Sequence, residues 1–260
     1  MMQVHPYSLA GKRALVTGAG TGIGRQLALG LAEAGCEVSL IGRREQPLAL
    51  VADEVRDLGG DASCYTCDVS SEEGLRALES TSATVDVLVN NAGVSDRQPW
   101  LDVKRDDWDA VIDLNLWGGF RLAQMTAPGM IKRKWGRIIN VASLYAERAP
   151  DRERYPGVSS FDLPAYGASK AGALALTRHL AVILGSFGIT VNAISPGMFR
   201  TERTEGVLTP AVEEALSSRT PMRRLGTGED LRGAVAFLAS DAASFITGID
   251  LVIDGGYSLV

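Results

Sequence analysis

The sequence KRALVTGAGTGIG, residues 12–24, decides the fold of this 260-residue chain. Its first part, residues 12–17, is a short apolar run that predicts a buried strand, and a glycine-rich turn follows directly. Apolar residues then recur at three- and four-residue spacing as far as Gly35, which predicts a helix that ends at this glycine. A second apolar run, residues 36–42, completes a β-loop-α-β unit.

The same alternation continues along the chain and predicts a single α/β domain over residues 1–260, because strands separated by helices form a parallel sheet. Its expected fold is a Rossmann-type, doubly wound sheet of about seven strands with helices on both faces. The stretches 144–164 and 197–220 are expected to be irregular, and both follow strand ends, where ligand loops lie. Further helices are expected at 47–58, after Ser70, at 108–132 and at 165–184, and further strands at 62–66, 85–89, 136–142, 189–195 and 251–253.

Composition limits the classes of partner. Apolar residues make up 46% of the chain and charged residues 22%, enough for one buried core and a polar surface. The net charge is −5 and the basic residues are scattered, so no nucleic-acid partner is expected. No apolar run approaches the roughly 18 residues that a membrane span needs, and the amino terminus lacks a signal-peptide pattern. We therefore expect a cytoplasmic protein with no membrane contact.

Cysteine and histidine are scarce. The three cysteines are too few for a disulfide framework and fit a reducing compartment. Cys64 and Cys67 form a C-x-x-C pair at the end of a predicted strand, without the second ligand pair that a zinc site would need, so we interpret them as packing residues. With His5 and His179 as the only histidines, no metal site is expected.

The glycine-rich turn is the candidate cofactor site. Such a turn between a strand and a helix lets the backbone approach a diphosphate, while the helix amino terminus supplies unpaired N–H groups and a positive dipole. The spacing Gly18-x-x-x-Gly22-x-Gly24 departs from the general G-x-G-x-x-G pattern, and a glycine-rich turn alone is a weak signal. The candidate residues of the turn are Gly18, Thr21, Gly22, Ile23 and Gly24.

Tyr166 and Lys170 are candidate catalytic residues. They lie four residues apart in a predicted helix, so their side chains share one face. A phenol has a pKa of about 10, and a neighbouring ammonium group stabilises the phenolate and lowers that pKa, which makes the tyrosine usable as an acid or a base. The Tyr-x-x-x-Lys pattern by itself is weak, because most such pairs lie on protein surfaces.

Taken together, these motifs resemble those of the short-chain dehydrogenase/reductase family, over nearly the whole chain from Ala10 to Gly256. The string TGxxxGIG, residues 17–24, is the family's form of the glycine-rich turn, and the other family segments follow in order. The resemblance implies that these segments complete the cofactor site, with Asp68 and Val69 at the adenine, Asn91, Ala92 and Gly93 at the end of the fourth strand, and Pro196, Gly197 and Thr201 at the nicotinamide carboxamide.

The same resemblance implies catalytic roles. Ser143 follows the fifth strand and Asn115 lies in the preceding long helix, where the catalytic serine and asparagine of the family stand. By this resemblance, Ser143 hydrogen-bonds the substrate oxygen and Tyr166 transfers the proton. Lys170 tunes Tyr166 and holds the ribose, and Asn115 supports a water relay. Hydride would then move between the nicotinamide and a carbinol or carbonyl carbon, so the expected activity is an NAD(P)-dependent alcohol or ketone oxidoreductase.

The end of the second strand favours NADP. Gly42 stands where an acidic residue would bind the ribose hydroxyls of NAD, and Arg43 and Arg44 follow it. A guanidinium group binds a 2′-phosphate through paired hydrogen bonds, so NADP is the expected cofactor. NAD stays open, because Glu45 could serve as a displaced ribose acid and the arginines could be a solvated cluster at a helix start.

One departure from the family concerns the spacing of Ser143 and Tyr166. Tyr166 follows Ser143 by 23 residues, whereas about a dozen is usual in the family, so roughly ten extra residues lie within 144–164. They form a surface loop or a wall of the substrate pocket. In the second case a guanidinium group of Arg148, Arg152 or Arg154 could bind a substrate carboxylate, unless Glu147, Asp151 and Glu153 neutralise these cations.

The sequence is compatible with several functions. Residues 196–202 and 221–226 are similar to those of gluconate 5-dehydrogenase-like members, which favours a polyol or sugar acid, and the same features occur in 3-oxoacyl-carrier-protein reductases. A non-catalytic nucleotide-binding regulator would have lost a catalytic position, and an epimerase of the extended branch would need a longer chain. By the resemblance, a homotetramer forms through helices 108–132 and 165–184.

Overall fold

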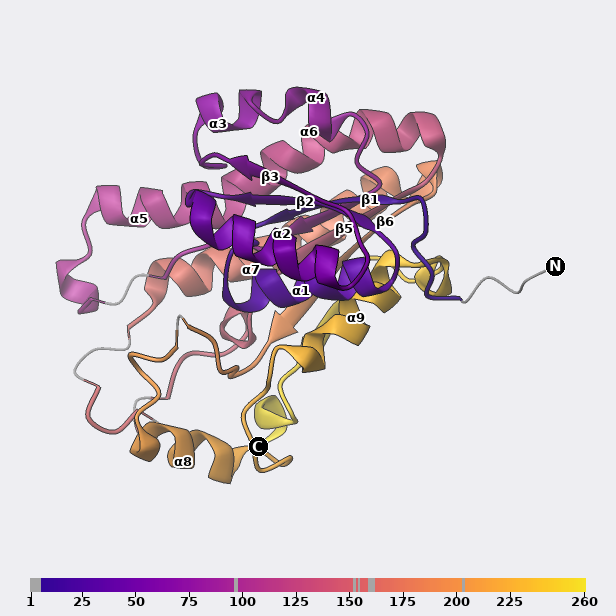
Figure 1. Ribbon diagram of the computed structural model, residues 1–260. Coiled ribbons are helices and arrows are strands. Elements are labelled where there is room, and N and C mark those ends of the chain that lie inside the picture. Colours follow the sequence, from indigo (N-terminus) through magenta and orange to yellow (C-terminus); the bar gives the residue numbers. More distant parts are fainter. Residues whose placement is uncertain (1–5, 96–97, 152, 154, 159–161, 203) are drawn as a thin grey trace.

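The computed structural model describes residues 6–95, 98–151, 153, 155–158, 162–202 and 204–260. Its centre is a sheet of seven parallel strands in the order β3-β2-β1-β4-β5-β6-β7 (Figure 1). The expected Rossmann-type sheet is therefore confirmed, and each strand lies within two residues of its predicted bounds. The strands are β1 (Arg13–Thr17), β2 (Glu37–Gly42), β3 (Ala62–Thr66), β4 (Val87–Asn90), β5 (Gly136–Val141), β6 (Ile189–Pro196) and β7 (Asp250–Ile253).

Helices cover both faces of the sheet, and successive strand residues contribute to two separate hydrophobic layers. Val16 and Val89 pack in one layer with α1 (Gly22–Glu33), α2 (Glu45–Asp57) and α9 (Glu229–Ala239). Leu15 and Leu88 pack in the other layer with α6 (Gly118–Arg133) and α7 (Pro164–Leu184). Because both faces are buried at the centre of the sheet, β1 and β4 are short apolar runs in the sequence, and this made them predictable.

The expected long helix 108–132 is interrupted at its centre. The structure has α5 (Arg105–Ile112), then a π-helical turn η2 (Asp113–Trp117), then α6. The chain continues in the same helical path, but the wider turn changes which backbone groups pair. Asn115 lies in this π-helical turn, in line with the tendency of π-turns to occur at functional sites.

The expectation that residues 197–220 are irregular is wrong for their second half. Residues 210–219 form helix α8 (Pro210–Arg219). The signals for its start are in the sequence, because the hydroxyl of Thr209 accepts a hydrogen bond from the N–H of Val212 at 3.3 Å and Pro210 occupies the first turn. Two short helices, α3 (Glu72–Arg76) and α4 (Glu79–Ser82), follow β3.

The strand order places the site. The chain proceeds outward from β1 to β3 and then returns to β4 on the other side of β1, so a crevice opens between the connections that leave β1 and β4. The segment after β5, including the 3₁₀ turn η3 (Leu144–Ala146), leaves from the same edge of the sheet. It packs against α8, which lies below the sheet in Figure 1.

Candidate functional site

A cavity of about 690 Å³ lies at the carboxyl ends of the central strands. Its volume is in the range of small-molecule and cofactor sites. The residues predicted to bind the cofactor or to catalyse the reaction line this cavity, except Asn115; they are the glycine-rich turn, Arg43, Arg44, Asp68, Val69, Asn91, Ala92, Gly93, Ser143, Tyr166, Lys170, Pro196, Gly197 and Thr201.

The glycine-rich turn is held to the end of β4 by side-chain hydrogen bonds. The hydroxyl of Thr17 accepts the backbone N–H groups of Asn91 and Ala92, each at 2.9 Å. The amide of Asn91 donates to the carbonyl oxygens of Thr17 at 2.9 Å and Gly18 at 3.2 Å. These bonds fix the two strand ends against each other at the point where the strand order reverses.

The turn also has the close approaches that a diphosphate cradle needs. A Cβ atom on Gly24 would lie 2.2 Å from the carbonyl oxygen of Gly18 and 2.4 Å from the amide nitrogen of Asn91. Gly18 and Gly22 have φ angles of +63° and +56°, a region that other residues rarely adopt. The residues present therefore fit a dinucleotide, because only glycine brings this backbone within reach of a ligand.

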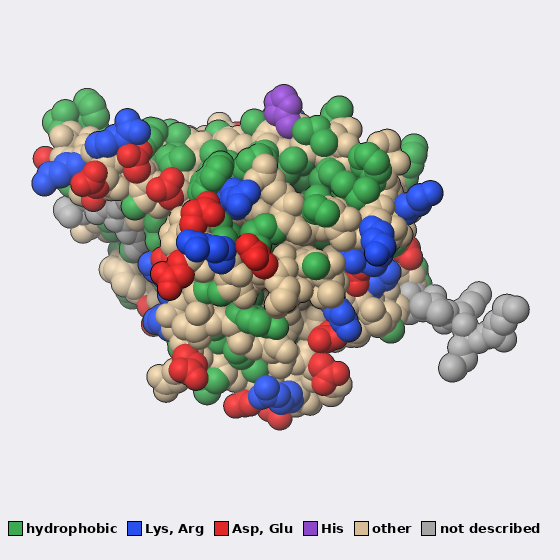
Figure 2. All heavy atoms as spheres, turned by 90° about the horizontal axis from the view of Figure 1, so that it is seen from above, with side chains coloured by type: hydrophobic (Ala, Val, Ile, Leu, Met, Phe, Trp, Pro, Cys, Tyr) green, Lys and Arg blue, Asp and Glu red, His purple; other side chains and the backbone are tan. Residues whose placement is uncertain are grey.

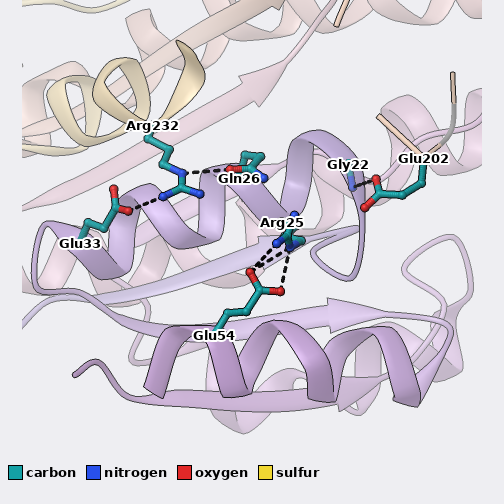
Figure 3. Close-up of polar contacts among 7 residues, drawn as sticks. All are labelled: Gly22, Arg25, Gln26, Glu33, Glu54, Glu202 and Arg232. Carbon is teal, nitrogen blue, oxygen red and sulfur yellow. Dashed lines mark hydrogen bonds and ion pairs between the residues drawn. The ribbon is translucent and has the colours of Figure 1, made fainter. Parts of the chain in front are cut away.

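The amino terminus of α1 binds an anionic group in this structure. The N–H of Gly22, the first residue of α1, donates to Oε2 of Glu202 at 2.9 Å (Figure 3). The arginine next to it is already paired, because Arg25 donates to Glu54 of α2 at 2.5 Å (Figure 3). The helix dipole and the unpaired N–H groups of the first turn thus remain the main attraction for an anion at this point.

The expected 2′-phosphate site lies at the end of β2. Arg43 and Arg44 are both exposed, and Nη1 of Arg43 lies 3.9 Å from Oδ2 of Asp68. Burial favours a higher pKa for Asp68, but hydrogen bonds from the hydroxyl and N–H of Ser70, together with Arg43, lower that pKa below its ordinary value. Glu45, the alternative ribose acid, is exposed and does not line the cavity.

The catalytic candidates come from β5 and α7. Ser143 is buried two residues after β5, and its hydroxyl oxygen accepts the N–H of Tyr145 at 3.1 Å. Lys170 is only 4% exposed, and its ammonium nitrogen lies 5.7 Å from the centre of the Tyr166 ring. The predicted helix thus places Tyr166 and Lys170 together, and the cavity brings Ser143 to the same place.

Asn115 lies outside the described cavity wall but is hydrogen-bonded toward the catalytic candidates. Its side-chain oxygen accepts the N–H of Val94 at 2.7 Å. Its amide donates to the carbonyl oxygen of Val94 and to the hydroxyl of Ser169, each at 2.9 Å. Ser169 in turn donates to the carbonyl oxygen of Tyr166 at 2.7 Å. Asn115 therefore connects the end of β4 to the turn of α7 that carries Tyr166.

Sequence reasoning missed a second set of lining residues. They are apolar or aromatic and come from residues 144–163 and 198–208: Leu144, Tyr145, Tyr155, Leu163, Met198, Phe199, Val207 and Leu208. Burial, with the adjacent Tyr155 hydroxyl, raises the pKa of Tyr145 far above its ordinary value, so this phenol stays neutral. The signal in the sequence was the presence of large apolar residues within a stretch that is otherwise charged.

The charged residues of 144–164 take other positions. Arg148 and Glu147 are exposed, and Arg148 does not line the cavity. Asp151 lies 3.7 Å from Arg219 of α8. Arg152 and Arg154, the other cations proposed to bind a carboxylate, lie outside the described residues.

The two cysteines of the C-x-x-C pair lie in different surroundings. Cys64 is exposed on β3 and Cys67 is half-buried in the cavity wall, and burial raises the pKa of both thiols. In the described part of the chain, His, Cys, Asp and Glu side chains form no cluster that could hold a metal ion. No helix among the described residues is both long and apolar enough to cross a bilayer.

Comparison with known proteins identifies the family. A family model described as enoyl-(acyl carrier protein) reductase matches residues 18–258. The 3-oxoacyl-[acyl-carrier-protein] reductase of Staphylococcus aureus is 38% identical over 251 residues, which cover 94% of this chain and 97% of that protein.

Two solved structures resemble the fold throughout. One is a gluconate 5-dehydrogenase from Burkholderia cenocepacia in complex with NADP and tartrate, with a TM-score of 0.88, 37% identity and 99% of both chains covered. The other is a 7α-hydroxysteroid dehydrogenase with NADH and 7-oxo glycochenodeoxycholic acid, with a TM-score of 0.89, 36% identity and 98% of both chains covered. The chain therefore belongs to the short-chain dehydrogenase/reductase family and is an NAD(P)-dependent oxidoreductase of alcohols and ketones.

Proposed function

We propose that Ser143, Tyr166 and Lys170 catalyse proton transfer to and from the substrate oxygen. The observation that supports this assignment is the burial of the Lys170 ammonium beside the Tyr166 ring, in the same cavity wall as Ser143. Ser143 donates a hydrogen bond to the substrate oxygen. Tyr166 gives that oxygen a proton in reduction and takes it back in oxidation, and the Lys170 ammonium stabilises the phenolate between these steps. The nicotinamide cofactor, when bound, supplies or accepts the hydride.

We assign Asn115 a positioning role. All the hydrogen bonds described for its side chain go to Val94 and Ser169, and the cavity wall does not include it. It acts on the reaction by fixing the start of α7, and therefore Tyr166, relative to the end of β4. The family resemblance implied a water relay at this residue, and such a relay would be in addition to the hydrogen bonds of Asn115 to Val94 and Ser169.

We infer that the cofactor site is built for NADP in preference to NAD. The residues that support this preference are Arg43 and Arg44, which line the cavity at the end of β2, where Gly42 replaces an acidic residue. Gly18, Thr21, Gly22, Ile23 and Gly24 would hold the diphosphate. Asp68, Val69, Asn91, Ala92 and Gly93 would line the adenosine side, and Pro196, Gly197 and Thr201 the nicotinamide side.

We further propose that the chain is one domain in a cytoplasmic homotetramer. Strands from residue 13 to residue 253 join one sheet, which supports a single domain.

Exposed apolar side chains support the assembly. On α7, Val182 and Ile183 are 85% and 61% exposed, and Trp108 and Trp117 are exposed on the neighbouring helical run. Figure 2 shows hydrophobic side chains gathered around the purple histidine, while acidic and basic side chains are interspersed elsewhere on this face. Light scattering at micromolar concentration tests the assembly, and a monomer would contradict it.

The catalytic assignment is tested with Tyr166→Phe. The change removes the proton donor and keeps the ring, so cofactor-dependent turnover of any ketone that the wild-type enzyme reduces should be lost. Binding of NADPH, followed by its fluorescence, should stay within about twofold of wild type, because no hydrogen bond essential to the cofactor is expected to be lost. Substantial remaining turnover would refute the assignment.

A further inference from the structure

Four described residues of the segment 144–164, here called the insertion, line the cavity: Leu144, Tyr145, Tyr155 and Leu163. Tyr155 of the insertion is only 3% exposed although four charged residues, 151–154, precede it in the sequence. Its hydroxyl is in hydrogen-bond contact with the hydroxyl of Tyr145 and donates to the sulfur of Met198 at 3.5 Å. Both partners also line the cavity, so the hydroxyl of Tyr155 is held from two sides, and Tyr145 connects it to Ser143 through the hydrogen bond of its N–H to the serine hydroxyl.

This wall is packed like a core. Leu163 and Val158 of the insertion lie in one hydrophobic cluster with Leu216 of α8 and Tyr257 near the carboxyl terminus. The carboxylate of Asp162 accepts the N–H of Trp100 at 3.1 Å, which attaches the end of the insertion to the segment before α5. The insertion is therefore a built part of the substrate site.

The chemical character of the wall is apolar. The apolar and aromatic lining residues of 144–163 and 198–208 are Leu144, Tyr145, Tyr155, Leu163, Met198, Phe199, Val207 and Leu208. Thr204 also lines the cavity, and its hydroxyl already donates to the carbonyl oxygens of Phe199 and Thr201. The described charged residues of the cavity are Arg43, Arg44 and Asp68 at the end of β2, Glu202 at Gly22 and Lys170 at Tyr166. The hydroxyls of Tyr145 and Tyr155 are in contact with each other. A polyol placed here would lose water at several hydroxyls and find few partners.

We propose that Tyr155 determines substrate specificity and that the substrate presents an apolar carbon skeleton to it. The inference rests on the proposed function, which places the reacting oxygen at Ser143 and Tyr166. The apolar wall at Tyr155 would favour a ketone or secondary alcohol with a hydrocarbon ring or chain next to the reacting carbon, in preference to a sugar acid or polyol.

The test compares three ketones with NADPH: trans-1-decalone, 5-keto-D-gluconate and the small ketone 2-butanone. We expect the wild-type enzyme to reduce decalone with a kcat/KM at least about tenfold higher, the effect of one well-buried hydrocarbon group. Tyr155→Ala should lower kcat/KM for decalone about ten- to a hundredfold while that for the small ketone 2-butanone changes less than about threefold. The exposed insertion residue Arg148 offers a matched control. Arg148→Ala should leave kcat/KM unchanged for both decalone and 2-butanone.

The outcomes separate the inference from the proposed function. A wild-type preference for 5-keto-D-gluconate would overturn the apolar substrate class. An equal loss of kcat/KM on all ketones in Tyr155→Ala would overturn the role of Tyr155. Both results would leave the proposed function intact. Absence of turnover of every ketone with both cofactors would overturn the proposed function itself. The wild-type preference needs no variant, so it does not depend on how well Tyr155→Ala folds.

An independent observation concerns cofactor entry. Glu202 follows β6, and its carboxylate holds the N–H of Gly22 at the amino terminus of α1 (Figure 3). This N–H belongs to the group that a helix offers to a phosphate, and the first turn of α1 contains no acidic residue of its own. The preceding residue, Thr201, lies against the same turn, because a Cβ atom on Gly22 would be 3.5 Å from the Cβ of Thr201.

We propose that Glu202 competes with the cofactor diphosphate for the N–H of Gly22. One N–H group cannot serve both anions, and two negative groups at one helix terminus repel each other. The carboxylate must therefore leave Gly22 when the diphosphate binds. The contact keeps the helix terminus satisfied without cofactor and lowers the cofactor affinity.

The test is the dissociation constant of NADPH and of NADH for Glu202→Gln and Glu202→Ala. Both variants should bind both cofactors more tightly by about two- to tenfold, the scale of one exposed charge-assisted hydrogen bond. The gain should be equal for the two cofactors, because they share the diphosphate. Glu205, another exposed acid on the same segment, provides the control, and Glu205→Gln should leave both constants unchanged. Unchanged or weaker binding in the two Glu202 variants would overturn the competition.

Discussion

The ammonium group of Lys170 donates a hydrogen bond of 2.5 Å to the carbonyl oxygen of Val141. Val141 is the last residue of β5, two residues before Ser143, so this bond connects α7 directly to the strand that positions the serine. A buried ammonium group is stable only when its N–H groups have partners. The bond therefore holds the lysine beside Tyr166 in a fixed place.

We predict that Lys170→Ala impairs both turnover and cofactor binding. The variant loses the cation that stabilises the Tyr166 phenolate, so turnover of a ketone that the wild-type enzyme reduces should fall by about a hundredfold or more. It also loses the donor that the family resemblance assigns to the cofactor ribose, so NADPH should bind more weakly in a fluorescence titration. Tyr166→Phe is the comparison, because it should lose turnover alone. Wild-type cofactor affinity in Lys170→Ala would remove the second role.

A second prediction concerns cofactor choice. Replacing both Arg43 and Arg44 by alanine should weaken NADPH binding roughly ten- to a hundredfold, as expected for the loss of hydrogen bonds to a charged phosphate. NADH affinity should change little. Arg56 is an exposed arginine of α2 that does not line the cavity, so Arg56→Ala is the matched control. Equal losses for NADPH and NADH would show that the pair does not read the 2′-phosphate.

A third prediction uses two glycines with opposite surroundings. A methyl group on Gly24 would meet the Gly18 carbonyl oxygen at 2.2 Å, whereas one on Gly233, inside α9, would meet nothing within 4 Å. Gly24→Ala should lower the free energy of unfolding by about 1–3 kcal/mol or more. Gly233→Ala should leave it unchanged or raise it by up to about 1 kcal/mol. Urea unfolding without cofactor measures both, and equal effects would contradict the close approach at Gly24.

The cofactor end of the cavity could be predicted from the sequence because its requirements are local. Gly18 and Gly24 are needed where one backbone passes close to another, and such a need leaves glycines at fixed spacing. Tyr166 and Lys170 are one helical turn apart, so their pairing was also visible in the sequence. The doubly wound sheet followed from runs of apolar residues that are buried on both faces.

The substrate end could not be predicted in the same way. Tyr155 contacts Met198, 43 residues further along the chain, and contacts at such separations leave no periodic signal. The charges of the insertion dominate its sequence and pointed to Arg148, which the structure places on the surface, whereas the described residues that line the cavity are Leu144, Tyr145, Tyr155 and Leu163. The hydrogen bonds of Asn115 to Val94 and Ser169 likewise depend on the π-helical turn, which no spacing rule indicated.

The last prediction concerns Asp250, the first residue of β7. Its Oδ2 accepts the hydroxyl of Ser195 at 2.8 Å, while Oδ1 is buried and has no hydrogen-bond partner among the described residues. Burial raises the pKa of Asp250 above its ordinary value; Ser195 lowers it in part, the nearby Glu147 raises it and Arg178 lowers it. At neutral pH the folded protein therefore carries an unfavourably placed negative charge.

The sign of the pH dependence follows from linkage. Because the folded pKa of Asp250 exceeds the unfolded one, its contribution to stability is fully present below the unfolded pKa, about 3.8, and is lost as pH rises through the folded pKa. Asp250→Asn should therefore be more stable than wild type near pH 7.5 and should lose this advantage as the pH falls toward 4. Asp230 is the opposite case, because its hydrogen bonds with Arg224 lower its pKa. Asp230→Asn should be less stable than wild type at neutral pH, and the difference should persist at pH 4.5, because it shrinks only as the pH falls below the unfolded pKa of about 3.8. Thermal unfolding at pH 7.5 and 4.5 measures both variants, and an Asp250→Asn protein that is less stable at pH 7.5 would show that the carboxylate is well accommodated.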